Sequence, residues 1–222
     1  MKLLSESYKS KKESRDGRKI FMQYFSPARL SGHEVCPNRT KACTEFCLNT
    51  AGMGVFKNVQ AARVNRTKLY FDNFDIYLAQ LVKEIAKLQI KHGKIAIRLN
   101  GTSDIDFFKR LEFKKLAAQF DDVIFYDYTK DLNRCIAYKR GEYPANYFLV
   151  FSERDNREEI FKALNHNISV VKIVWNEEDE FAYNHINNYS VIDGDLDDAR
   201  WLDAHKTMIY LKPKGKARKF KN

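Results

Sequence analysis

Two apolar runs, Lys94-Ile-Ala-Ile-Arg-Leu-Asn100 and Val123-Ile-Phe-Tyr-Asp-Tyr-Thr129, flank a helical pattern over about residues 105–120. Short runs rich in β-branched and aromatic residues are typical of strands. A strand, a helix and a second strand in this order indicate parallel pairing, because a crossover helix returns the chain to the same edge of the sheet. Nearly continuous apolar strands also fit a parallel sheet, which is covered on both faces. The sequence therefore predicts an α/β fold.

The same alternation extends over most of the chain. Further strands are predicted at 20–26, 147–152, 170–175, 189–193 and 207–212, and further helices at about 57–92, 131–140 and 156–165. A 3.6-residue apolar stripe marks the longest helix, which Gly93 is placed to end: Tyr77, Leu78, Leu81, Val82, Ile85 and Leu88. About seven strands in this rhythm predict a small parallel (β/α) barrel, complete or incomplete. An open doubly wound sheet is the alternative.

Composition sets the domain plan and the class of partner. We expect a basic N-terminal segment at 1–19, a single barrel-like domain at 20–212 and a basic tail at 213–222. No run approaches the roughly 20 apolar residues of a membrane helix, and the N-terminus lacks an apolar signal core. These features predict a cytoplasmic protein without a membrane partner. The formal charge of +10 favours a polyanion, and we expect nucleic acid.

Three of the four cysteines lie close together, in the loop that follows the first predicted strand. Cys36, Cys43 and Cys47 fall within twelve residues, whereas Cys135 is remote in sequence. Thiolates suit zinc and iron–sulfur clusters, so the loop predicts a metal site. Three ligands leave a coordination position open for chemistry unless His33, Cys135 or another group fills it. A structural zinc site and free buried thiols are the alternatives.

Polar residues recur just after the predicted strands, where a barrel places its active site. The acids predicted to be catalytic, as general base or nucleophile, are Asp104, Asp127, Asp193 and Asp195. The residues predicted to bind substrate or phosphate are Arg63, Arg98, Asn100, Ser103, Lys130, Arg154, Arg200 and Lys214. The alternative is that some of these acids only pair with neighbouring cations to hold the loops together.

Several of these residues, taken in order, resemble a family of small bacteriophage and plasmid proteins over about residues 20–218. The matching stretches are Cys36-Pro37, Cys43, Cys47-Leu48, Ala62-Arg63, Thr67, Arg98 to Asp104, Tyr126 to Lys130, Ser152, Asp193-Gly-Asp195, Asp198 and Arg200. The resemblance implies a compact α/β barrel, similar to two classes of enzyme. Guanine transglycosylases use barrel aspartates and a Cys/His zinc site. Radical S-adenosylmethionine enzymes hold an iron–sulfur cluster by a three-cysteine loop after their first strand.

Three functional hypotheses follow. The first is a phage-type enzyme that modifies a nucleic-acid base, exchanging guanine for a deazaguanine in DNA rather than RNA. Asp104 or Asp127 would attack or deprotonate, while an acid after the sixth strand would orient the base. The second is a radical-type enzyme in which the loop cysteines hold a [4Fe–4S] cluster that binds S-adenosylmethionine. The third is a zinc-stapled protein that binds nucleic acid or a host factor without catalysis. Each would act in the host cytoplasm if the protein is phage-encoded, and oligomeric state stays open.

Overall fold

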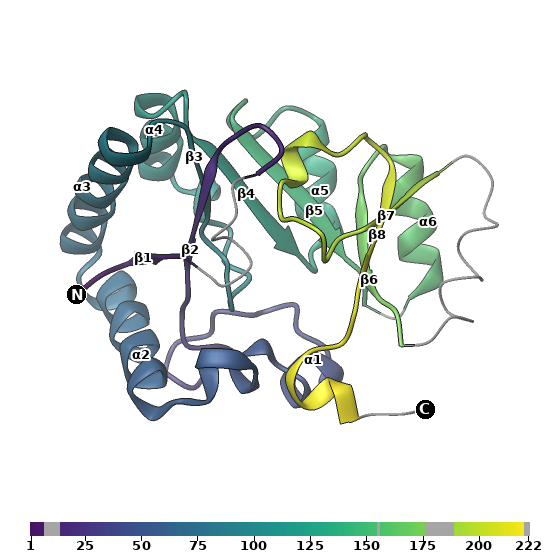
Figure 1. Cartoon of the computed structure of the whole chain (residues 1–222), viewed down its shortest axis with the longest axis horizontal. Coiled ribbons are helices and arrows are strands. Elements are labelled where there is room, and N and C mark those ends of the chain that lie inside the picture. The colour runs from purple at the N-terminus through teal and green to yellow at the C-terminus, as the bar shows by residue number, and fades with distance from the viewer. Residues whose placement is uncertain (7–13, 155, 176–188, 220–222) are drawn as a thin grey trace.

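The computed structural model describes residues 1–6, 14–154, 156–175 and 189–219. Its centre is an eight-stranded sheet in the order β1-β2-β3-β4-β5-β6-β8-β7 (Figure 1). Only β1 runs antiparallel to its neighbour. The strands are β1 (Leu4–Ser5), β2 (Lys19–Gln23), β3 (Ile95–Arg98), β4 (Ile124–Thr129), β5 (Tyr147–Ser152), β6 (Val170–Ile173), β7 (Ser190–Asp193) and β8 (Thr207–Leu211). The seven predicted strands are thus confirmed.

Helices connect the strands much as the sequence predicts. The α-helices are α1 (Lys41–Glu45), α2 (Lys57–Asp72), α3 (Phe74–His92), α4 (Leu111–Gln119), α5 (Leu132–Lys139) and α6 (Arg157–Asn165). Short 3₁₀ turns are η2 (Leu48–Thr50), η3 (Gly52–Val55), η4 (Phe107–Lys109), η5 (Arg200–Leu202) and η6 (Gly215–Lys219). The predicted continuous helix over 57–92 is interrupted. Asn73, with φ −143° and ψ 60°, leaves the helical region and separates α2 from α3. Gly93 ends α3 with φ 68°, as expected.

The sheet is wound in one direction from β2 to β6. Each of these strands lies beside the next one in sequence, and a right-handed crossover that always steps the same way keeps its helices on one face. The main core lies between this face and the helices, with Leu81 of α3, Phe113 of α4 and Ile160 of α6 among its buried side chains. Strands β1 and β7 form the two edges of the described sheet, so the fold is an open sheet rather than a closed barrel.

The last crossover steps backward, and this places it on the other face of the sheet. Strand β8 inserts between β6 and β7, so the chain returns toward β6 after β7. A right-handed crossover in that direction must pass over the face without helices, here called the second face. There Trp201 of η5 packs on Tyr126 of β4, with ring centroids 5.4 Å apart, and its indole N–H donates to Asp16 at 3.0 Å. The connection between β7 and β8 thus packs on the second face of the sheet, the face that would line the interior if the sheet closed into a barrel (Figure 1).

The N-terminal segment, expected to be no more than basic, contributes to the core. Leu3 and Leu4 are fully buried, and their backbone N–H groups donate to the Glu84 carboxylate of α3 at 2.8–3.0 Å. In the described part of the chain, no helix is long and apolar enough to cross a membrane.

Replacing Trp201 with alanine tests whether the β7–β8 connection holds the second face. Loss of the Tyr126 contact and the Asp16 hydrogen bond should lower the free energy of unfolding in urea by about 3 kcal/mol. The neighbouring Leu202→Ala, at a side chain 39% exposed, should cost less than about 1 kcal/mol. Equal losses from the two variants would contradict the packing described here.

Candidate functional site

The cysteine loop lies at the mouth of the sheet, meaning the edge where β2 to β8 have their C-terminal ends. The loop follows β2 and is built from short elements. Thr40 caps α1 by accepting a hydrogen bond from the backbone N–H of Cys43 at 3.1 Å. Cys47 caps η2, its sulfur accepting from the backbone N–H of Asn49 at 3.5 Å. Two of the three cysteines therefore begin or occupy a helical turn, which fixes their place along the loop.

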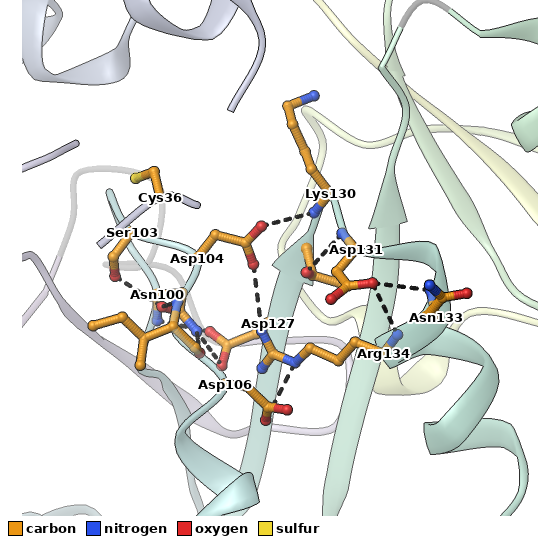
Figure 2. A network of polar contacts seen from close by, with 12 residues as sticks. Cys36, Asn100, Ser103, Asp104, Asp106, Asp127, Lys130, Asp131, Asn133 and Arg134 are labelled. Atoms are coloured by element: carbon orange, nitrogen blue, oxygen red, sulfur yellow. Dashed lines mark hydrogen bonds and ion pairs between the residues drawn. The ribbon is translucent and has the colours of Figure 1, made fainter. Parts of the chain in front are cut away.

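Cys36 packs against the segment that follows β3. Its sulfur lies 3.7 Å from the carbonyl oxygen of Thr102, and the backbone N–H of Asp104 donates to Val35 at 2.7 Å. Figure 2 shows Cys36 beside Ser103 and Asp104. The loop after β2 and the polar segment after β3 therefore share one rim of the sheet.

The same loop reaches the far side of the mouth. The Phe46 ring meets the Trp175 ring, just after β6, with centroids 6.1 Å apart. Gly215, after β8, approaches the loop so closely that a Cβ there would lie 2.9 Å from Cβ of Ala51, and its φ of 59° also favours glycine. The cysteine loop thus spans the mouth from the end of β3 to the end of β8.

Two of the loop thiols have a raised pKa. The pKa of Cys36 is raised to about 11, mainly by burial, with smaller contributions from Asp104 and Cys47. Burial also raises the pKa of Cys47, to which Cys43 adds, whereas the Arg63 cation opposes the shift. All four cysteines are free of disulfides. The raised pKa values keep Cys36 and Cys47 protonated at neutral pH, and a bound metal ion would supply the positive charge that ionises them.

The loop cysteines are the right kind of ligand for a metal ion, but their side chains are not arranged around one point. Three free, half-buried thiols in one loop are a suitable soft ligand set. Among the described residues, however, no three His, Cys, Asp or Glu side chains converge as ligands of one ion. Neither expected fourth ligand faces the loop. His33 pairs with Asp72 of α2 at 3.0 Å, and Cys135 is buried in α5. Metal binding would require the loop side chains to turn toward one another.

Beside Cys36, a buried polar network joins the ends of β3 and β4 (Figure 2). The Asp127 carboxylate accepts hydrogen bonds from the backbone N–H of Asn100 at 2.7 Å and from its side-chain amide at 3.0 Å. Ser103 donates to the Asn100 side-chain oxygen at 2.8 Å. Asp104 accepts from the backbone N–H of Lys130 at 3.0 Å. Five predicted site residues are thus brought together.

Arg134 of α5 is the centre of this network, and the sequence analysis missed it. Its guanidinium contacts Asp104 at 3.3 Å and donates to the Tyr147 hydroxyl at 2.5 Å. The Tyr147 hydroxyl in turn lies 3.4 Å from Asp127. Burial lowers the pKa of Arg134, but Tyr147 and the surrounding carboxylates raise it on balance, so the cation is permanent. No sequence signal marked it, because arginine within a short helix ordinarily faces solvent.

Burial dominates the acid–base behaviour of the two central acids. It raises the pKa of Asp127 to about 6, although Arg134 and Asn100 favour the charged form. Burial also raises the pKa of Asp104, against the opposing effect of Arg134. Each carboxyl already has several partners and little access to solvent. This favours a role in holding the mouth together over direct attack on a substrate.

The other two predicted acids lie at the far edge of the sheet. Asp193 ends β7, which is four places from β4, or at most about 19 Å along the sheet. Asp195 pairs with Lys214 at 2.7 Å and accepts from the backbone N–H of Lys212 at 2.8 Å. The four acids therefore form two separate groups.

The predicted arginines also fall into two groups, those that lie over aromatic rings and those that pair with acids. Arg98 lies over the Tyr128 ring at 4.3 Å, and Arg63 lies over the Tyr24 ring at 5.0 Å, both near the mouth. Arg154 turns back to Glu159 of α6 at 2.6 Å. Arg200 pairs with acids of the β7–β8 connection. Of these four, Arg63 is the one whose charge acts on a loop cysteine, Cys47.

A phage-type family model, Gene product 88, matches residues 2–221. The chain belongs to this family. Gene product 88 membership agrees with the predicted resemblance to phage proteins. No curated protein and no solved structure matches the chain.

The Asp127 carboxyl should make stability depend on pH. Because its folded-state pKa of about 6 exceeds the ordinary 3.8, the folded protein holds this proton more tightly than the unfolded chain. Its contribution to stability is therefore full below pH 3.8 and falls as pH rises through 6, by on the order of 3 kcal/mol. In a plot of the free energy of unfolding in urea against pH, Asp127→Asn should lack the fall that this carboxyl causes as pH rises through 6. The exposed Asp121→Asn should keep it, and an unchanged slope in Asp127→Asn would contradict the assignment.

Proposed function

We propose that this protein is an enzyme that modifies nucleic acid, with its reacting centre at Cys36, Cys43 and Cys47. The supporting observation is the position of the cysteine loop. It follows the first parallel strand of an open sheet wound in one direction and spans the mouth from Thr102 to Gly215. Groups at the C-terminal ends of parallel strands are where α/β proteins carry out chemistry.

Among the thiol-bound groups, a [4Fe–4S] cluster has the stronger support. A structural zinc needs a fourth ligand, and neither His33 nor Cys135 faces the loop. A cluster held by three cysteines keeps one iron open, and that iron would supply the position at which S-adenosylmethionine binds. The chain's own residues would hold and shield the group. Cys36 is anchored to Thr102, and the N–H of Asn49 points at Cys47.

Nearby cations support an anionic substrate. The Arg98 guanidinium is tied by one nitrogen to the Asn100 carbonyl oxygen at 3.1 Å and rests on Tyr128. Arg63 lies next to Cys47 and has a buried Nε–H that donates no hydrogen bond to any described residue. Together with the net charge of +10, these groups favour a phosphate-bearing partner. The compartment would be the host cytoplasm.

Base exchange by carboxylates remains the second candidate, on one observation. Asp104 lies near Cys36, Asp127 with its pKa of about 6 lies behind Asn100, and such shifted acids are common at sites of proton transfer. Incubation with DNA and a labelled deazaguanine should then give incorporation that Asp104→Ala abolishes. Absence of incorporation under every metal condition would remove this candidate.

Metal analysis of anaerobically purified protein tests the main proposal. We expect a brown protein that contains iron and sulfide in equal amounts. Each single replacement of Cys36, Cys43 or Cys47 with alanine should abolish the colour and remove most of the iron, because one ligand is lost. Cys135→Ala is the matched control and should keep both, since that thiol is buried in α5. A colourless protein with one zinc per chain, or full iron in the three loop variants, would contradict the proposal.

A further inference from the structure

The cysteine loop carries an unusual number of exposed apolar side chains. Leu48 is 47% exposed, Met53 68%, Val55 52% and Phe56 52%. These four residues, here called the loop patch, lie within nine residues of sequence that begin next to Cys47. Isolated exposed apolar residues are ordinary, but a contiguous group beside a candidate site indicates a binding surface.

The loop patch lies in a part of the chain without acids. No Asp or Glu occurs from residue 46 to residue 71, and none occurs after Asp203. The first of these segments holds Lys57, Arg63, Arg66 and Lys68, and the second holds Lys206, Lys212, Lys214, Lys216, Arg218 and Lys219. A surface built from such segments attracts a polyanion over its whole extent.

The two acid-free segments meet at the mouth. η2 contacts η6, and Gly215 lies against Thr50 and Ala51 (Figure 1). Lys216, Arg218 and Lys219, here called the tail cations, are exposed on η6 while Ala217 between them is buried. The tail cations are therefore anchored beside the cysteine loop.

Beneath the loop patch, Arg63 connects this surface to the thiols. Arg63 is only 6% exposed, its Nε–H donates no hydrogen bond to any described residue, and its side chain donates to Asn49 in η2. Arg63 therefore places a buried positive charge beside Cys47, under the surface that the loop patch forms.

We propose that the loop patch and the tail cations bind single-stranded nucleic acid and lead one of its bases to the thiols. This inference rests on the proposed function and names its substrate class. Cations alone hold phosphates of single and double strands alike. Exposed aromatic and aliphatic side chains add contacts to the faces of unpaired bases, which a duplex keeps stacked inside. Phe56, at the start of α2, is the side chain best suited to stack on a base.

Fluorescence anisotropy with the full chain tests the base contact. The probes are one labelled DNA oligonucleotide as a single strand and the same sequence as a duplex. Wild-type protein should prefer the single strand. Phe56→Ala should weaken single-strand binding about tenfold and leave duplex binding unchanged. Ile90→Ala, at a side chain 89% exposed on α3, is the matched control and should change neither. Equal binding of both probes, or no effect of Phe56→Ala, would overturn the proposal.

A salt series tests the tail cations. Replacing Lys216, Arg218 and Lys219 together with glutamine should weaken binding and lower the slope of log affinity against log salt by about 2. The control triple on α3, Lys83, Lys87 and Lys91 to glutamine, removes the same charge from another exposed face and should lower the slope far less. Equal effects of the two triples would show that only net charge matters and would overturn the proposal.

Two further readouts separate the possible failures. Binding to vesicles of anionic phosphatidylglycerol without binding to oligonucleotide would assign the surface to a lipid and overturn the inference. Iron and sulfide are measured in the same preparations. A protein with its iron but without single-strand preference would lose this inference and keep the thiol centre. A protein with single-strand preference and no iron would keep the surface and lose the thiol centre.

Discussion

The mouth of this protein depends on one buried carboxylate. Asp127 accepts both the backbone N–H and the side-chain amide of Asn100, and so ties the chain leaving β3 to β4. Asn100 in turn accepts the backbone N–H of Ile105 and the hydroxyl of Ser103, which shapes the segment from 100 to 106. Cys36 rests on that segment through Thr102. A thiol, a loop and two strands thus take their places from the hydrogen bonds of one buried carboxyl group.

The direction of winding explains the rest of the site. Steps in one direction from β2 to β6 place the helices on one face and every connecting loop after a strand at the same mouth. The backward step from β7 to β8 sends the next connection over the second face, where Trp201 packs on Tyr126. The second face is therefore covered in its middle, and the cysteine loop and the chain after β8 meet at the mouth.

Much of this arrangement could be predicted from the sequence, for a physical reason. Apolar strand runs and helical stripes are local signals, so all seven strands and the end of α3 at Gly93 were predictable. Parallel pairing then requires the loops after β2, β3 and β4 to share an edge, which brought Cys36 near Asp104. The insertion of β8 between β6 and β7 could not be predicted, because strand order depends on tertiary packing. For the same reason the sequence could not show that Asp193, at the end of β7, lies four strands away from Asp127 in β4. Arg134 gave no signal, since its burial depends on Asp104 and Tyr147 from other elements.

The central claim is that Cys36, Cys43 and Cys47 hold one iron-containing group at this mouth. Alkylation of the anaerobic protein, followed by mass spectrometry of its peptides, tests that claim residue by residue. The account predicts that the three loop thiols are protected together in the iron-loaded protein and become reactive together once a chelator removes the iron, while Cys135 behaves the same in both. Equal reactivity of the loop thiols before and after iron removal would contradict it.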